Sequence, residues 1–250
     1  MKRRRRPGAV TLALAVPLAA LAYFLAAPLL PGLPAGDATV LVAGSVGLLF
    51  VAASTLALLP AYQTLVGPLL VVLGAGLLVA ALNVEDAGGV GAGANVVEAL
   101  LASAVGLLLA RWLEGPAIAV AVALFVAAVD VWSVTSGPSS RMLAEGTDRV
   151  DPLSFDLPAW GDAGSAGHLG LSDAVFVSMF AAWAWRYGFR RATTIAAMVA
   201  GLLAALGLSV ALDTAVPALP CIAAGFLAPN LDRIVALLSA ARRAGPDELR

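Results

Sequence analysis

The chain has 250 residues, of which 61% are hydrophobic and only 12% are charged, and its formal net charge is −1. Soluble domains are about 45–50% apolar, so this composition indicates a polytopic membrane protein without a separate soluble domain. We expect no nucleic-acid partner. Cys221 is the only cysteine, which excludes an intramolecular disulfide, and no set of Cys and His has metal-ligand spacing. We therefore expect no metal and no cofactor, and a lipid bilayer around the protein.

Apolar runs recur from Gly8 almost to the C-terminus. A bilayer core about 30 Å thick requires about 20 apolar residues per helix, and these runs have about that length. They lack the period-2 alternation of lipid-facing strands, which favours helices over a barrel. We predict an all-α polytopic membrane fold with about eight transmembrane helices, or nine if one run contains two. The eight spans lie at 8–30, 38–59, 63–82, 94–112, 116–136, 170–187, 192–212 and 216–238.

The chain, residues 1–250, is interpreted as a single multi-pass membrane domain. Its N-terminal helices occupy 1–112, and the helices that carry the candidate catalytic residues occupy 116–238. A long polar segment at 137–169 separates two of the latter. The first apolar run follows a basic start and is longer than the roughly 7–15 residues of a signal-peptide core, so we expect an uncleaved first span.

Arginines in the short connections predict the orientation of the chain. The basic N-terminus should stay in the cytoplasm, and counting forward places Arg111, Arg186 and Arg190 on the same side. Both termini are then cytoplasmic in a multi-pass protein of the cell membrane, and the segment 137–169 lies outside. This segment contains prolines and glycines and is expected to be either a mobile loop or a partly ordered lid.

Two aspartates lie inside apolar spans. Asp130 is near the outer end of the fifth span and Asp173 near the outer start of the sixth, so we expect both at similar depth. An ionised Asp at the centre of a membrane helix costs about 2.5–3.5 kcal/mol on insertion scales, so a retained pair indicates function. The motif from Pro217 to Pro220 begins the eighth span on the same side. The simpler alternative is a pair of structural carboxylates at helix ends.

A close pair of carboxylates has a defined chemistry. At about 4 Å and an effective dielectric constant near 20, two negative charges repel by about 4 kcal/mol, so the pair would share one proton. The ionised carboxylate then takes a proton from water, and the protonated carboxyl donates to a peptide carbonyl oxygen, as in aspartic proteases. The two aspartates thus predict a dyad that hydrolyses a peptide bond.

The order of these motifs resembles that of presenilins, signal peptide peptidases and their microbial homologues. The resemblance covers the C-terminal half of the chain and rests on Val129-Asp130, on Gly170-Leu171-Ser172-Asp173 and on Pro217-Ala218-Leu219. The family has a Tyr-Asp helix, a Gly-x-Gly-Asp helix and a Pro-Ala-Leu motif. The chain departs from that pattern at Val129, which replaces Tyr, and at Ser172, which replaces the second Gly.

The resemblance implies a presenilin-like fold and the activity of an intramembrane aspartic endopeptidase. Asp130 and Asp173 would be the catalytic dyad, and the partners would be transmembrane proteins or peptides, including signal-peptide remnants. The predicted orientation matches that of signal peptide peptidases. The substrate-binding residues implied by the resemblance are Gly170, Leu171, Ser172, Pro217, Ala218 and Leu219.

Three other functions fit parts of this pattern. A proton-coupled transporter would use the two aspartates as protonation sites within the membrane. A prepilin-type peptidase also has a Gly-x-Gly-Asp motif, although its long loops are usually cytoplasmic and the long loop is expected outside here. A protease homologue impaired by Ser172 would act as a scaffold.

Several polar and aromatic residues are given structural interpretations. His168 is interpreted as a solvated loop side chain without a role in the site, and Glu98 as a carboxylate near a helix start. Trp183, Trp185 and Tyr187 are predicted to form an interfacial belt.

Overall fold

The computed structural model describes residues 7–34, 36–61, 69, 72–77, 91–137, 154–161 and 165–243. Within these residues the chain is mostly helical, with one two-stranded antiparallel sheet. Five helices in this part of the chain are long and apolar enough to cross a membrane. They are Asp37–Ala57, Gly93–Trp112, Pro116–Ser136, Arg191–Leu212 and Ala218–Ala240.

These five helices match five of the eight predicted spans. The first predicted span forms α1 (Pro7–Ala26), followed by the short η1 (Ala27–Leu29). The sixth forms α8 (Leu171–Arg186), which has only 16 residues and is shorter than an ordinary span. The third lies largely outside the described residues. The mostly helical character of the chain is therefore confirmed and is compatible with a membrane protein, while the number of crossings stays a prediction.

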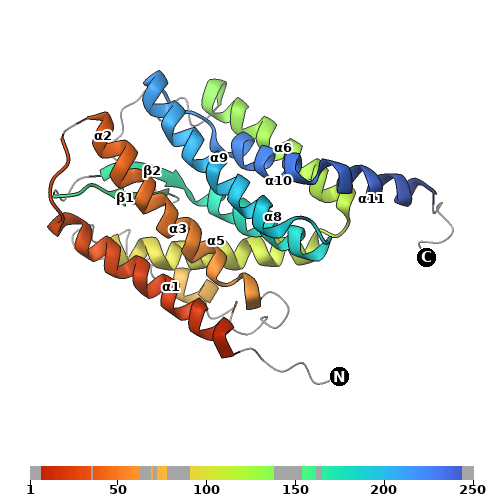
Figure 1. The fold of residues 1–250 in the computed structure, drawn as a ribbon, viewed down its shortest axis with the longest axis horizontal. Helices are drawn as coiled ribbons and strands as arrows, with labels where there is room; N and C mark the ends of the chain where they lie inside the picture. Colours follow the sequence, from red (N-terminus) through yellow and green to blue (C-terminus); the bar gives the residue numbers. More distant parts are fainter. Residues whose placement is uncertain are drawn as a thin grey trace.

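The N-terminal half forms a layer of long helices. The short α2 (Asp37–Thr39), the π-helical η2 (Val40–Gly44) and α3 (Ser45–Ala57) make one continuous apolar rod, after which comes η3 (Leu59–Ala61). Both α1 and α5 (Gly91–Trp112) pack against α3, and Figure 1 shows α1 and α3 side by side.

The C-terminal half contains both aspartates. Its helices are α6 (Pro116–Ser136), α8, α9 (Arg191–Leu212), α10 (Ala218–Leu227), η4 (Ala228–Asn230) and α11 (Leu231–Arg243). In Figure 1, α10 lies between α6 and α9, and α11 projects beyond the bundle. α10 also packs against α8 and so contacts both aspartate-bearing helices.

A β-hairpin with one buried face precedes α8. Its strands are β1 (Ser154–Pro158) and β2 (Ser165–Gly170), with Phe155 opposite Leu169 in the antiparallel register. Both of these side chains are buried, and the hairpin packs against α5 and η2. The expectation of an entirely α-helical fold was therefore incomplete. The described part of the segment 137–169 is ordered, as one of the two expectations had it. The strands were not predicted because tertiary packing holds the hairpin and its alternating apolar pattern is short.

The core between α8 and α10 is aromatic. Phe180 and Phe226 stack with ring centroids 4.8 Å apart, and Trp183 packs beside them. Trp183 is 0% exposed, and its indole N–H donates to the carbonyl oxygens of Ala110 and Leu113, each at 3.2 Å. The prediction that Trp183 belongs to an interfacial belt was wrong, because its side chain is buried against α5, where carbonyl oxygens at the end of that helix accept its N–H.

Close contact fixes α8 on α5. A Cβ atom on Gly106 of α5 would lie 1.9 Å from Ser178 Oγ and 2.2 Å from the carbonyl oxygen of Val175, so the two helices meet only because this residue is glycine. The hydroxyl of Ser178 also donates to the carbonyl of Ala102 across the same contact. The helix that carries Asp173 is therefore anchored along its length.

Candidate active site

Asp130 contacts the start of a helix far along the chain. Its Oδ2 atom accepts a hydrogen bond of 3.0 Å from the backbone N–H of Leu219, 89 residues later. Leu219 is the second residue of α10, and the first N–H groups of a helix have no partner within it. Pro217 and Pro220 flank this position and have no N–H to offer. Leu219 is therefore one of few donors at this terminus, and Asp130 uses it.

Asp173 lies at the start of its own helix. It is the third residue of α8 and 8% exposed, and its carboxylate accepts a hydrogen bond from the backbone N–H of Gly170, the N-cap residue. This contact is one half of a capping box. Because Gly170 is also the last residue of β2, Asp173 lies where the hairpin passes directly into the helix.

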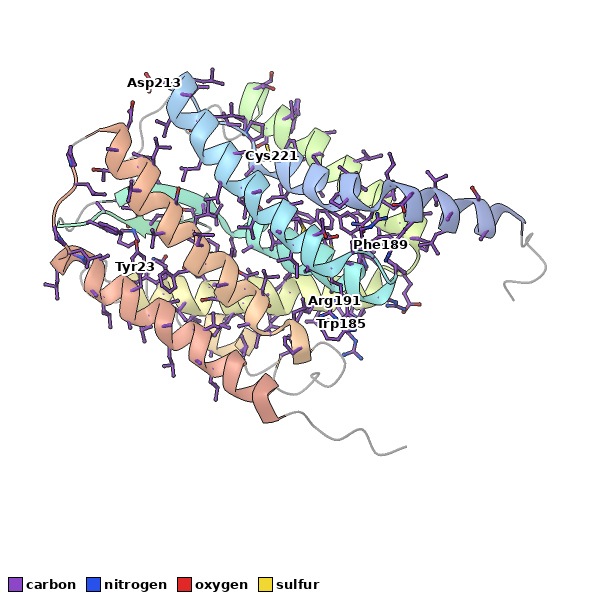
Figure 2. All side chains as sticks on the ribbon, viewed as in Figure 1. Tyr23, Trp185, Phe189, Arg191, Asp213 and Cys221 are labelled. Carbon is purple, nitrogen blue, oxygen red and sulfur yellow. The ribbon has the colours of Figure 1, made fainter. Side chains whose placement is uncertain are left out.

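The two carboxylates share one electrostatic environment. α6 and α8 both pack against α10, and the negative charge of Asp130 acts on Asp173. The same charge acts on Cys221, which Figure 2 labels on α10. Each carboxylate therefore faces the N-terminal end of a helix, where the helix dipole favours negative charge, while the two charges oppose each other. The negative charge of Asp130 therefore disfavours ionisation of Asp173.

The predicted substrate-binding residues form two segments beside these carboxylates. Gly170, Leu171 and Ser172 immediately precede Asp173, with Ser172 exposed. The other segment begins at Pro217, whose extended backbone (φ −62°, ψ 125°) is the N-cap of α10, and continues through Ala218 to the buried Leu219. The first segment adjoins Asp173 and the second binds Asp130.

The two departures from the family pattern lie outside the packed core. Val129 is 42% exposed on α6, beside the exposed apolar side chains of Phe125 and Trp132. Ser172 is exposed at the second position of α8. Neither side chain fills space in the core around Asp173, so the packing of that carboxylate does not depend on them.

Asn95 of α5 holds the hairpin that leads to Asp173, and the sequence did not single it out. Its side-chain Nδ2 donates to the carbonyl oxygen of Asp156 in β1 at 2.7 Å, and its Oδ1 accepts from the N–H of Asp156 at 3.0 Å. The carboxamide thus pairs with β1 as a neighbouring strand would. The available signal was a lone Asn in an apolar helix, because a buried amide requires hydrogen-bond partners.

His168 and Glu98 lie apart from the dyad contacts given above. His168 Nδ1 is 3.6 Å from Asp156 Oδ1 across the hairpin, and both side chains are exposed, which agrees with its interpretation as a solvated residue. Glu98 follows Asn95 by about one turn of α5 and is partly buried. Within the part of the chain that the structure describes, no group of three His, Cys, Asp or Glu residues is arranged to hold a metal.

Comparisons with known proteins do not add a family to this geometry. No protein-family model matches the chain, and no curated protein shows significant sequence similarity to it. The functional argument therefore rests on the described contacts and on the motif resemblance.

Proposed function

We propose that the protein is an intramembrane aspartic endopeptidase with Asp130 and Asp173 as its catalytic dyad. The observation that supports this most directly is the hydrogen bond from the Leu219 N–H to Asp130. It joins two of the three motifs that resemble presenilins, and the charge interaction between Asp130 and Asp173 links the third. If Asp130 served only to cap α10, its interaction with the buried carboxylate of Asp173 would not be needed.

In the proposed reaction the dyad holds one proton. The ionised carboxylate removes a proton from a water molecule, whose oxygen attacks the peptide carbonyl carbon, while the protonated carboxyl donates its proton to the carbonyl oxygen. The first carboxyl then donates the proton it took from water to the departing amide nitrogen, while a hydroxyl of the tetrahedral intermediate returns a proton to the second carboxylate, and the C–N bond breaks. The dyad ends with the single proton with which it began.

The hairpin offers a way to hold the substrate open. A transmembrane helix must unwind before its peptide carbonyl is attacked, and its freed backbone groups then need partners within the membrane. The Asn95 carboxamide pairs with β1, whereas β2 has β1 as its only strand partner among the described residues. An extended substrate segment added beside β2 would run toward Gly170 and Asp173.

The packing of α6 suggests the route of entry. Phe125, Val129 and Trp132 are exposed on this helix, as expected for a surface that faces lipid, and Asp130 is only partly buried. We infer that a transmembrane substrate approaches the dyad from the α6 side. With the predicted orientation, such substrates would have a cytoplasmic N-terminus or be signal-peptide remnants.

The test is cleavage of a labelled transmembrane peptide by the purified protein in lipid nanodiscs. Asp130→Asn and Asp173→Asn each remove the acid–base function while keeping a similar side chain, and we expect kcat to fall by about 10²–10⁴-fold. Asp213→Asn is the matched control, because Asp213 is exposed and has φ 48°, a conformation that Asn accepts. Cleavage that persists in either dyad variant would contradict the proposal.

A catalytically inactive scaffold is the second candidate. The observation in its favour is that each carboxylate accepts a backbone N–H at a helix N-terminus, which is the role of a structural cap. This function predicts no peptide cleavage by the native protein or by Ser172→Gly. It also predicts that both Asp→Asn variants change thermal stability and nothing else.

A further inference from the structure

The C-terminal helix α11 begins at one end of the bundle. Arg190 immediately precedes α9; its backbone N–H donates to Asn230 Oδ1 at 2.9 Å, and its guanidinium binds both carboxylate oxygens of Asp232. Arg233 donates to the carbonyl of Gly188, in the connection between α8 and α9. The first residues of α11 therefore lie beside the start of α9 and beside the connection from α8 to α9.

The length of α9 relates that position to the bilayer. α9 has 22 residues and is about 33 Å long, so it alone crosses a hydrocarbon core of about 30 Å. Its first residue then lies at one membrane boundary, and α11 begins there. The chain reaches this boundary through α10, which begins beside Asp130, and then η4. Although Ala218–Ala240 is long and apolar enough for one span, its α11 portion lies at or beyond the boundary.

The sequence of α11 is amphipathic. Apolar residues recur at Leu231, Ile234, Val235 and Leu238, which is the spacing of one helix face, and Asp232 belongs to the other face. Ile234 is buried against the core, whereas Leu231 and Val235 are 62% and 55% exposed. The apolar face is therefore wider than the part that the protein covers. At a membrane boundary, these two exposed side chains would reach the hydrocarbon.

This end of the molecule is also basic. Among the described residues it has Arg111, Arg186, Arg190, Arg191 and Arg233, against only Glu114 and Asp232, which are paired with Arg186 and Arg190. The hydrogen bond from Arg190 lowers the pKa of Asp232 below its ordinary value, so this carboxylate is ionised at neutral pH and pairs with the Arg190 guanidinium. Arg191 lies 3.4 Å over the ring of Trp185, and Figure 2 shows both at this end of α9, opposite Asp213.

We propose that α11 lies in the headgroup layer of the bilayer and binds an anionic lipid surface. Leu231 and Val235 enter the acyl boundary, while Arg233 and the arginines at the start of α9 attract the lipid charge. This inference does not rest on peptidase activity. It depends on three observations: Arg190 holds the start of α11 beside the start of α9, Leu231 and Val235 are exposed, and arginines predominate around the start of α9.

The test uses the full-length chain in vesicles. In a Cys221→Ser background, Val235→Cys and Ala236→Cys are each labelled with an environment-sensitive fluorophore, because position 236 is exposed on the polar side. We expect the label at 235 to be blue-shifted and quenched by shallow lipid-attached quenchers, and the label at 236 to be quenched by aqueous acrylamide. Deep lipid quenching at both positions would show a spanning helix, and acrylamide quenching at both would show a helix in water; either result overturns the proposal.

Lipid charge is tested separately. Vesicles of phosphatidylcholine alone are compared with equal parts of phosphatidylcholine and phosphatidylglycerol, at low and high salt. We expect stronger lipid quenching at position 235 with the anionic lipid, and loss of that increase at high salt or in Arg233→Gln. The same quenching in both lipid compositions would contradict anionic recognition.

Discussion

The helices that carry the two aspartates, α8 and α6, are held in very different ways. α8 is buried along most of its length, contacts α5 through Gly106 and has Trp183 in the core. α6 buries only Ala119, Ala123 and Val126, all before Asp130, and packs chiefly against α10. The fold thus fixes one carboxylate, whereas the position of the other depends on a neighbouring helix and one hydrogen bond. In the proposed protease, aligning the dyad is a matter of placing α6 on α10.

The largest expected effect concerns the stability of α8. Trp183→Ala removes a fully buried side chain and two N–H contacts, and we expect it to lower the free energy of unfolding by about 3–5 kcal/mol. Phe125→Ala on α6 is the matched control, since the side chain of Phe125 is 66% exposed. Denaturant unfolding in mixed micelles measures both. Equal losses in the two variants would show that α6 is packed as firmly as α8.

A smaller effect is expected at the contact that holds Asp130. Leu219→Pro removes the donated N–H at a first-turn position that tolerates proline, whereas Leu219→Ala keeps it. A hydrogen bond to a charged group is worth about 1.5–3 kcal/mol, so kcat/KM should fall about 10- to 150-fold further in the proline variant than in the alanine variant. Steady-state cleavage of the transmembrane peptide measures this. Equal activities in the two variants would remove the Leu219 N–H from the mechanism.

The smallest expected effect is at Val129, the residue before Asp130. Val129→Tyr places a larger side chain on the exposed side of α6, so we expect the free energy of unfolding to change by less than about 0.5 kcal/mol. Thermal unfolding of the two proteins in the same lipid provides the comparison. A loss of several degrees would mean that Val129 faces a packed surface, and the description of α6 as the loosely held helix would be wrong.

The sequence predicted the helices that apolar composition marks and the contact between the Asp130 and Pro-Ala-Leu motifs. Apolar runs mark helices because lipid solvates no free backbone groups, and that rule located α6, α9 and both aspartates. The meeting of Asp130 with Leu219 agrees with the expected convergence of the Asp and Pro-Ala-Leu motifs. These features follow from local composition or from a motif.

Other features depend on contacts between distant segments and so left little trace in the sequence. The alternation of β1 comprises two buried residues, Phe155 and Leu157, which are too few to predict a strand. Nothing near Trp183 shows that the end of α5 will accept its N–H. The contact that brings the start of α11 to the start of α9 joins Arg190 and Asp232, which are 42 residues apart.

The pairing of Asn95 with β1 makes the hairpin one-sided. A third strand would be excluded from β1 at Asp156 and would have to join β2, whose last residue is covalently joined to the helix of Asp173. Because side chains alternate along a strand, sliding such a guest by one residue would reverse every side chain, whereas sliding it by two would preserve their facing. A protease of the proposed kind would then select scissile bonds that are separated by an even number of residues along the substrate. The Asn95 side-chain amide contributes to this selection because it occupies β1 and leaves β2 as the strand that a substrate could join.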